Sequence, residues 1–380
     1  MTTYRDAVND ALERLDDLGY ERNLGGGDLA NHGPMAAEAL AVLGHGEVIP
    51  EWVRVYRRAA PHHEPPVPYQ RLDGADEADW RAALGDIGRA GDFEELFVRE
   101  IAEQGWQAVL TRWWPRLLPG PMTGLTHGLI RTAHAVRGLG ATDRPTPLQV
   151  RELARGLGYW AARFIDAPGR GRLVGKLAVP AAVAAVGRLP QPVGSPQEGL
   201  TRMRNPSSMS GYAEALDTLA PDHTDRLLSD MTAHYAGVCV AHTDSWFPIP
   251  LLHGVTAPAA ARLVLPHLPP ELHEPTVAAL WQAQVTLLMM VTTSPAGEDD
   301  ALDRARQAQP PAWDELIARA VDHRDEHVIK FTEACLREHA LRPDPRYAWA
   351  VDIAQQRIER PDAAGGSAVE VRFRGATARQ

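Results

Sequence analysis

The chain has 380 residues, of which 44% are hydrophobic, and a net charge of −10 at neutral pH. This length allows a large core, and the negative charge argues against a nucleic-acid partner, which needs a basic surface to neutralise phosphates. The two cysteines, Cys239 and Cys335, are too few for a disulfide framework and suit a reducing compartment. The acidic N-terminal segment is not a signal peptide, and the apolar runs are too short to span a bilayer. We therefore expect a cytoplasmic protein without a membrane partner.

Helical periodicity dominates the chain, which predicts a mainly α fold. We expect one large helical domain over residues 1–360, with two lobes that meet near the Pro- and Gly-rich loop at 187–199, and a C-terminal tail at 361–380. One short strand is expected in this tail, at 367–375, where apolar and polar residues alternate. The predicted helices cover residues 4–18, 34–43, 93–106, 127–139, 148–165, 211–219, 224–234, 257–265, 276–291 and 313–338.

Common cofactor and catalytic motifs are missing from the sequence. The stretch GRGRLVGK resembles a phosphate-binding loop, but Leu177 stands where Ser or Thr would bind Mg²⁺. The stretch NLGGGDL lacks the glycine order of a dinucleotide fold, and neither HExxH nor GxSxG occurs. The sequence thus offers no nucleotide site, and the need for an external reductant such as NADPH is left open.

Three of the 15 histidines share a local pattern in which glycine follows directly. These are His32 in NHGP, His127 in THGL and His253 in LHGV. A glycine beside an imidazole lets a backbone or a ligand approach closely, and it also suits a turn or a helix start. Each histidine on its own is therefore compatible with a metal ligand and with a core or capping residue.

The segment VDHRDEHVIK contains one of only two lysines in the chain, Lys330; the other is Lys176. On a helix over 313–335, His323, His327 and Lys330 fall on one flank of the apolar stripe. Residues at i, i+4 and i+7 point to the same place, which predicts a metal site. Two alternatives are that Lys330 extends outward into solvent or pairs with Glu326.

Histidines together with a lysine can form a metal-binding site. Imidazole binds Fe, Zn, Cu or Ni, and open positions suit a redox-active metal that binds O₂. Burial beside a cation lowers the pKa of a lysine amine, which can then add CO₂ and become an anionic carbamate ligand; arginine cannot. A competing pattern, His242-Thr243-Asp244, matches half of a two-His-one-carboxylate site, but such sites resemble one another in lying on strand-rich folds.

Five segments in this order resemble the questin oxidase family: NHGPMAAEAL, WWPRLLPG, HGLIRTAHAVR, LHGVTAPAAARLVLPHLP and DEHVIKFTEACL. The likeness extends over nearly the whole chain. It implies a helical fold and O₂-dependent oxidative ring opening, or Baeyer–Villiger-like oxygenation, of anthraquinone-like polyketides. It also implies a mononuclear non-haem iron held by histidines and a carboxylated lysine.

Carried over position by position, the resemblance implies that Fe(II), or another divalent metal, binds one set of five ligands. The set is His32, His127, His253, His327 and Lys330, with His323 and His134 as reserve ligands.

The resemblance also suggests where a small aromatic substrate would bind beside O₂. Arg131, one turn after His127, would hold a substrate oxygen, and Trp113 and Trp114 would stack on the aromatic ring. The alternatives are a structural arginine and a tryptophan pair that belongs to the core.

Two other classes of function stay open from the residues alone. One is a non-catalytic helical binding protein for an aromatic metabolite, which predicts scattered, metal-free histidines. The other is a metal-dependent hydrolase, since a carbamylated lysine beside histidines also suits hydrolytic sites. Such hydrolases usually carry an Asp ligand on a β/α barrel, which the helical pattern does not support.

Overall fold

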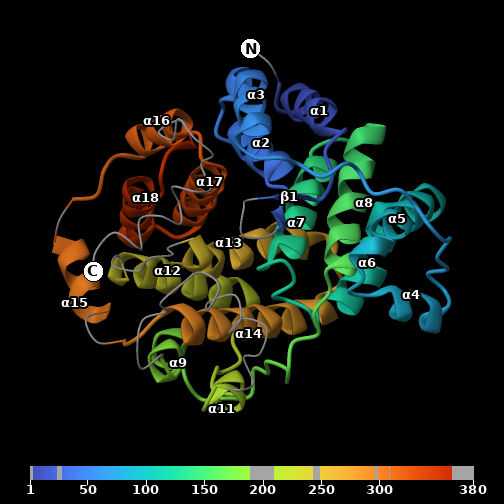
Figure 1. Cartoon of the computed structure of the whole chain (residues 1–380). Helices are drawn as coiled ribbons and strands as arrows, with labels where there is room; N and C mark the ends of the chain where they lie inside the picture. Colours follow the sequence, from blue (N-terminus) through green and yellow to red (C-terminus); the bar gives the residue numbers. More distant parts are fainter. Residues whose placement is uncertain are drawn as a thin grey trace, which may run out of the picture. The chain divides into compact units, whose positions relative to one another are not determined.

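The computed structural model describes residues 3–23, 28–188, 209–242, 249–295, 298–307 and 309–361. The fold is mainly α, as predicted (Figure 1). Within the described residues, the only sheet is an antiparallel pair formed by β1 (Glu21–Asn23) and β2 (Asp28–Ala30). The strand expected at 367–375 lies outside the described residues.

The chain divides into two compact units. The first unit contains residues 1–166 and 263–272, and the second contains residues 167–262 and 273–380. The division thus falls at 166–167, whereas the boundary expected near 187–199 lies inside the second unit, largely outside the described residues. A Pro- and Gly-rich stretch marks a local change of direction, but packing decides to which unit a helix belongs.

The first unit is a set of helices in which α7 packs on α8, α8 on α5, and α2 on α7. The helix α8 begins with a capping box: Thr146 accepts from the backbone N–H of Gln149, whose side chain accepts from the N–H of Thr146. The close contact of α7 with α8 depends on glycine, because a Cβ on Gly156 would lie 3.0 Å from Thr132 Cα. The helices are α1 (Tyr4–Leu15), α2 (Gly33–Val42), α3 (Ile49–Ala59), α4 (Glu77–Ala83), α5 (Ala90–Gln104), α6 (Trp106–Leu117), α7 (His127–Gly140) and α8 (Pro147–Ala162), with 3-10 turns η1 (Gly46–Val48), η2 (Ile87–Arg89), η4 (Leu265–His267) and η5 (Pro270–Leu272).

In the second unit, α12 packs against α14 and α18, and α17 packs against both α16 and α18. Trp281 on α14 is buried and donates its indole N–H to the carbonyl of Ala215, which ties α14 to α11. The helices are α9 (Val179–Ala185), α11 (Tyr212–Leu216), α12 (Thr224–Ala241), α13 (Ile249–Val264), α14 (His273–Val291), α15 (Glu298–Gln307), α16 (Trp313–His323), α17 (Glu326–Leu341) and α18 (Pro345–Arg357).

One segment, Ile249–His267, is long and apolar enough to cross a membrane by length and composition alone. Because 72% of its 18-residue window is buried inside the protein, its apolar side chains are accounted for by packing within the chain. This signal is therefore weak evidence for a membrane span.

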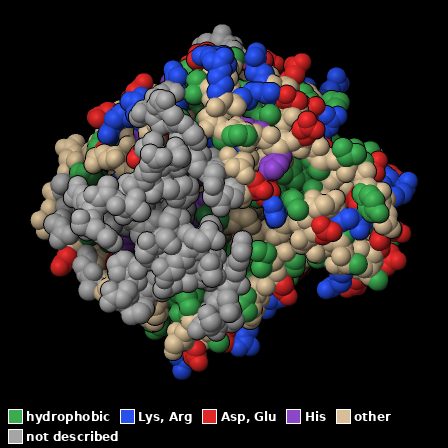
Figure 2. Space-filling model, in the orientation of Figure 1, with side chains coloured by type: hydrophobic (Ala, Val, Ile, Leu, Met, Phe, Trp, Pro, Cys, Tyr) green, Lys and Arg blue, Asp and Glu red, His purple; other side chains and the backbone are tan. Residues whose placement is uncertain are grey.

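Charged side chains of both signs are mixed on the face drawn in Figure 2. Many described arginines pair with nearby carboxylates, as Arg57 does with Asp17 and Arg172 with Asp217. Such pairing divides the surface charge into small neutral groups.

Candidate metal centre

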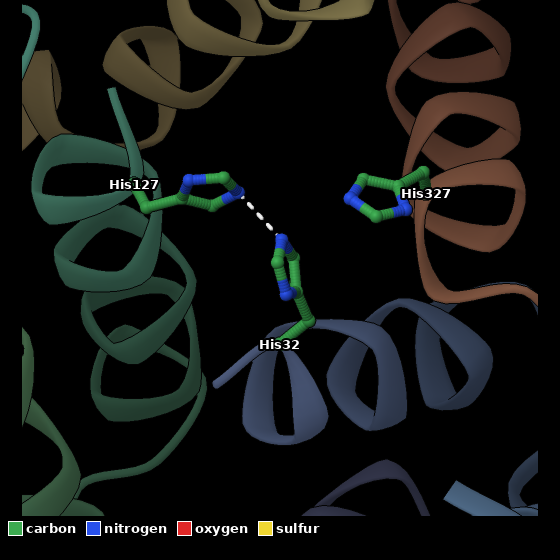
Figure 3. Close-up of side chains that lie close together, drawn as sticks. All are labelled: His32, His127 and His327. Atoms are coloured by element: carbon green, nitrogen blue, oxygen red, sulfur yellow. Dashed lines mark hydrogen bonds between the residues drawn. The ribbon is translucent and has the colours of Figure 1, made fainter. Parts of the chain in front are cut away.

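Two predicted ligands, His32 and His127, meet inside the first unit. His32 is the N-cap residue of α2 and His127 is the first residue of α7. Their Nε2 atoms are 2.6 Å apart, and the ring planes are nearly perpendicular at 87° (Figure 3). Both side chains are buried, with His32 only 1% exposed. Two buried imidazoles that point their Nε2 atoms at each other form one half of a candidate metal site.

An unusual turn fixes the orientation of His127. Gly124, Leu125 and Thr126 all have positive φ angles, of 56°, 56° and 67°. A bulky or β-branched residue rarely adopts this conformation, which stores strain of about 1–2 kcal/mol at each of the two non-glycine positions. The turn places the carbonyl oxygen of Gly124 2.5 Å from Nδ1 of His127, which must donate its proton there. In the neutral ring the lone pair is then on Nε2, the atom that faces His32.

Hydrogen bonds to the backbone fix the start of α2. The N–H of His32 donates to the hydroxyl of Tyr56 at 2.8 Å, and this hydroxyl donates to Oδ1 of Asn31 at 2.9 Å. The same Oδ1 accepts the N–H of Gly33, while Nδ2 of Asn31 donates to the carbonyl of Gly19. Burial raises the pKa of Tyr56, so its hydroxyl stays protonated and continues to donate. Hydrogen bonds from the N–H groups of His32 and Gly33 therefore fix the backbone before and after the His32 side chain.

The glycines that follow the three histidines make room for neighbouring side chains. A Cβ on Gly128 would lie 2.6 Å from Cγ of Trp160, and one on Gly254 would lie 2.0 Å from Cε1 of Tyr235. At Gly33 the closest atoms would be 3.0 Å away. The His-Gly pattern thus reflects close packing of aromatic rings against the backbone beside each histidine.

The second unit brings together three further predicted ligands: His253 on α13, and His327 and Lys330 on α17. All three side chains are buried. Burial, followed by the nearby charges of Lys330 and His327, lowers the pKa of His253 well below its usual value. His253 is therefore neutral at physiological pH, which is the form of imidazole that binds metals.

The expected continuous helix at 313–338 is wrong, because the chain breaks at Arg324. Arg324 has a φ of 66° and ends α16, and Asp325 then begins α17. The break separates His323 from His327: Nε2 of His323 faces the carbonyl of Ile358 at 2.9 Å. His323, the first reserve ligand, is thus engaged in a structural contact.

Asp325 was not anticipated from the sequence, although Asp is a common N-cap residue. Its Oδ1 accepts the N–H groups of His327 and Val328, at 2.9 and 3.3 Å. The same oxygen lies 3.2 Å from Nδ1 of His327. Asp325 is completely buried, and its carboxylate both caps α17 and contacts the ring of His327.

Lys330 follows His327 by three residues on α17 and is only 5% exposed. The alternative in which this lysine extends into solvent is wrong. Lys330 therefore lies inside the second unit, as His253 and His327 do.

His134, the second reserve ligand, belongs to an ion-pair cluster on α7. Its Nδ1 lies 2.8 Å from Oε2 of Glu38, and Nε of Arg137 donates to Oε1 of the same carboxylate at 2.7 Å. Burial alone would raise the pKa of Glu38, but the charge of Arg137 and the contact with His134 lower it to about 2. This cluster ties α2 to α7 two turns after His32 and His127. His134 is thus a structural residue.

Arg131 is buried and forms a two-bond ion pair with Glu152. Its Nε and Nη2 atoms donate to the two carboxylate oxygens at 2.7 and 2.8 Å. Although burial disfavours the charged form, Glu152 raises the pKa of Arg131 above its ordinary value, so the guanidinium is always charged. Nη1 has no hydrogen-bond partner among the described residues. The ion pair with Glu152 is what a structural role for Arg131 predicts. The Nη1 amino group is the part of the guanidinium that this pair does not use.

Trp113 and Trp114 are core residues, which corrects their assignment to a substrate site. Both are completely buried. The indole N–H of Trp113 donates to Glu100 at 2.8 Å and its ring packs edge-on against Phe97. Trp114 packs in the same way against Trp160, with ring centroids 5.2 Å apart. Neighbouring side chains thus occupy the faces on which a flat substrate would stack.

The competing His242-Thr243-Asp244 pattern receives no support as a metal site. Nε2 of His242 lies 2.9 Å from Oε1 of Glu298, which also accepts from Arg188. Asp244 lies outside the described residues.

The donor atoms of His32 and His127 fit a metal ion. Two imidazole nitrogens bound to one ion at about 2.1 Å, with an angle of about 90–110° between them, lie about 3.0–3.4 Å apart. The observed 2.6 Å requires the rings to move apart by a few tenths of an ångström. Gly124 already fixes the ring protonation of His127 that coordination through Nε2 requires. In the second unit, buried His253 offers another imidazole nitrogen, and buried Lys330 offers an amine.

The fold and the site define a mainly α protein with buried histidines, and helical proteins can hold a metal ion between facing helices. The family model described as Questin oxidase-like matches residues 29–137 and 191–335, and the chain therefore belongs to this family. Membership indicates an oxidoreductase of the oxidase or oxygenase kind. All five predicted ligands lie within the matched segments. No curated protein was found that matches the chain.

Proposed function

We propose that this protein is a non-haem iron oxygenase that opens or inserts oxygen into the ring of an electron-rich, anthraquinone-like polyketide. One Fe(II) would be held by the ligand set that the family resemblance implies, namely His32, His127, His253, His327 and Lys330. The observation that carries the proposal is the pair of Nε2 atoms of His32 and His127, with the Nδ1 proton of His127 already held by Gly124.

The ligand types support iron over other metals. Neutral imidazoles with an added carboxylate-like oxygen are a donor set that suits Fe(II) and leaves room for O₂. When bound, such an ion supplies the means to activate O₂ beside an electron-rich substrate. The chain's contribution is to keep the imidazoles neutral, to fix their ring protons and to exclude water from them.

A carbamate on Lys330 is part of the proposal. It would form when the uncharged Nζ amine attacks the carbon of CO₂, forms an N–C bond and loses one proton to solvent. The product is an anionic oxygen donor on a long arm. The burial of Lys330 supports this, as does the near absence of lysine elsewhere in a chain that otherwise uses arginine.

Arg131 supplies the remaining element of the proposal. Its buried Nη1 has two N–H groups that can donate to a phenolate or quinone oxygen of the substrate. The ion pair with Glu152 holds the guanidinium plane in place while leaving these donors unused. Arg131→Lys is expected to raise KM for the substrate more than it lowers kcat.

The test is oxygen consumption by protein loaded anaerobically with Fe(II), with a series of hydroxylated anthraquinones and their hydroquinones as substrates. We expect O₂ uptake and a ring-opened or oxygen-inserted product, both lost in His127→Ala. His45→Ala, on a partly exposed histidine outside the candidate site, is the matched control and should keep full activity. Tight binding of the aromatic compound without O₂ uptake would instead indicate a binding protein, and product formation without O₂ would indicate a hydrolase.

A further inference from the structure

The carboxylate of Asp325 touches the ring of a residue that the proposed function uses as a ligand. Oδ1 of Asp325 lies 3.2 Å from Nδ1 of His327, and it also accepts the backbone N–H of His327 at 2.9 Å. One oxygen therefore contacts both the backbone and the side chain of the same histidine. Because these bonds converge, the ring has little freedom to turn about its Cβ–Cγ bond.

The chemistry of this contact determines which nitrogen carries the proton. A carboxylate only accepts hydrogen bonds, so the ring atom that faces it must be N–H. In a neutral imidazole the other nitrogen, Nε2, then has the lone pair. Glu326 adds to this effect, because its Oε1 lies 3.7 Å from the same Nδ1. Both acidic side chains are buried, so solvent does not screen them.

The first unit uses a different group for the same purpose. At His127 the acceptor is the carbonyl of Gly124, and at His327 it is the side chain of Asp325. In both cases the chain before the histidine contains non-glycine residues with positive φ: Thr126 next to His127, and Arg324 before Asp325. Together with Leu125, these are the only such residues in the described part of the chain. Backbone strain is thus concentrated at the two turns that orient these rings.

We propose that Asp325 is a positioning residue that holds His327 in the Nδ1–H form, so that Nε2 is the atom presented to the metal. This inference rests on the proposed function, in which His327 is a ligand. It assigns Asp325 a second task besides capping α17. Removal of the carboxylate should weaken metal binding about 10–100-fold, the usual effect of losing a partner that orients a ligating histidine.

His323, four residues earlier, provides an internal reference. Its Nε2 faces the carbonyl of Ile358 at 2.9 Å and must be the N–H, while its buried Nδ1 has no hydrogen-bond partner among the described residues. His323 and His327 are therefore expected to have opposite ring protonation in the same protein. NMR of the full-length, metal-free protein with isotope-labelled histidine distinguishes the two forms by their ring-nitrogen shifts.

Two substitutions of Asp325 separate its capping of α17 from its effect on the ring of His327. Asp325→Asn keeps an oxygen that caps the helix and accepts from Nδ1–H, so His327 should stay in the Nδ1–H form. Asp325→Ser also caps well, but its side chain is too short to reach the ring, so His327 should shift toward a mixture of both forms. Asp76→Ser is the matched control, because Asp76 caps α4 with the same two-bond pattern and contacts no histidine.

The NMR spectrum tests the role of Asp325, and Fe(II) binding by the wild type tests the proposed function. Wild-type His327 in the Nδ1–H form, lost in Asp325→Ser together with at least tenfold weaker Fe(II) binding, supports the inference. His327 in the Nε2–H form in the wild type overturns it, and so does unchanged ring protonation in Asp325→Ser. The NMR result does not need metal, so a protein that binds no Fe(II) would contradict the proposed function and leave the ring protonation to be judged separately. If Asp325→Ser does not fold, the wild-type spectrum still decides.

Discussion

Nε2 of His127 faces Nε2 of His32 at 2.6 Å because the carbonyl of Gly124 holds the opposite nitrogen of the His127 ring. The two contacts act on one ring from opposite sides. They leave His127 with a single neutral form and a single orientation in the interior of the first unit. A ring prepared in this way loses little freedom on coordination, which favours tight binding.

The turn before His127 is expected to be sensitive to a single methyl group. Gly124→Ala would add a Cβ 2.8 Å from the hydroxyl of Tyr159, at a φ of 56°. Strain of about 1–2 kcal/mol and the contact both oppose the change, so the carbonyl should move away from His127. We expect a loss of at least about 2 kcal/mol in unfolding free energy and weaker Fe(II) binding.

Gly44→Ala is the control for this change. Gly44 also has a positive φ, of 86°, but a Cβ there would meet nothing within 4 Å. It should lose only about 1 kcal/mol from backbone strain, with Fe(II) affinity unchanged. Equal effects of the two substitutions on metal affinity would contradict a special role for the Gly124 turn.

The ion-pair cluster at Glu38 predicts a pH dependence of stability. The folded protein lowers the pKa of Glu38 from 4.5 to about 2, so the unfolded state binds a proton more readily. The cluster's contribution is therefore complete above about pH 4.5 and is lost as the pH falls toward 2. The size of the change corresponds to about 3 kcal/mol. Urea unfolding between pH 7 and 2.5 should show this slope in the wild type but not in Glu38→Gln.

Glu51→Gln is the matched control for Glu38, because Glu51 pairs with Arg54 on the exposed side of α3. It should leave the pH dependence of the wild type nearly unchanged, since exposed ion pairs contribute little. A wild-type slope that persists in Glu38→Gln would show that other carboxylates cause it.

The two lysines allow a direct test of the carbamate. Lys330→Arg keeps a long basic side chain but removes the nucleophilic amine, so Fe(II) binding and O₂ uptake should fall at least tenfold. Lys176→Arg, at the exposed lysine, should leave both unchanged. In the wild type, isotope-labelled bicarbonate should give a carbamate carbon signal that is absent from Lys330→Arg. Full activity of Lys330→Arg would exclude the carbamate while leaving the histidine ligands in place.

Close packing beside His253 predicts that the same glycine-to-alanine substitution changes stability differently at two helical positions. Gly254→Ala would place a Cβ 2.0 Å from the ring of Tyr235, which is completely buried and has no room to move. The clash outweighs the gain in helix propensity, and we expect a net loss of about 1–3 kcal/mol. Gly138→Ala on α7, where a Cβ meets nothing within 4 Å, should be neutral or gain up to about 1 kcal/mol. Thermal unfolding of both variants measures the difference.

The helical class could be predicted from sequence because it depends on local patterns, and the same holds for the burial of the candidate ligands. Amphipathic periodicity marked most of the helices, and the His-Gly motifs and the rare Lys330 marked buried positions. The break at Arg324 could not be predicted, because the apolar stripe continues through it and arginine stands where glycine or asparagine usually ends a helix. The N-cap preference of Asp325 was the available sign of a new helix start.

Long-range packing explains the remaining errors. Trp113 and Trp114 have the composition of a stacking site, and only the positions of Phe97 and Trp160 show that their faces are covered. His134 resembles a ligand by its spacing from His127, and its pairing with Glu38, 96 residues away in sequence, decides otherwise. Such contacts between distant residues leave no trace in a single sequence.

The proposed function requires that His32 and His327, which are far apart in the sequence, bind the same metal ion. The most direct measurement is elemental analysis of the full-length protein after anaerobic Fe(II) loading and removal of unbound metal, for the wild type, His32→Ala and His327→Ala. We predict about one iron per chain in the wild type and a loss of most of it in each variant, because each substitution removes one ligand of the same ion. An iron content that stays unchanged in either variant, or a wild type that retains no metal, would contradict it.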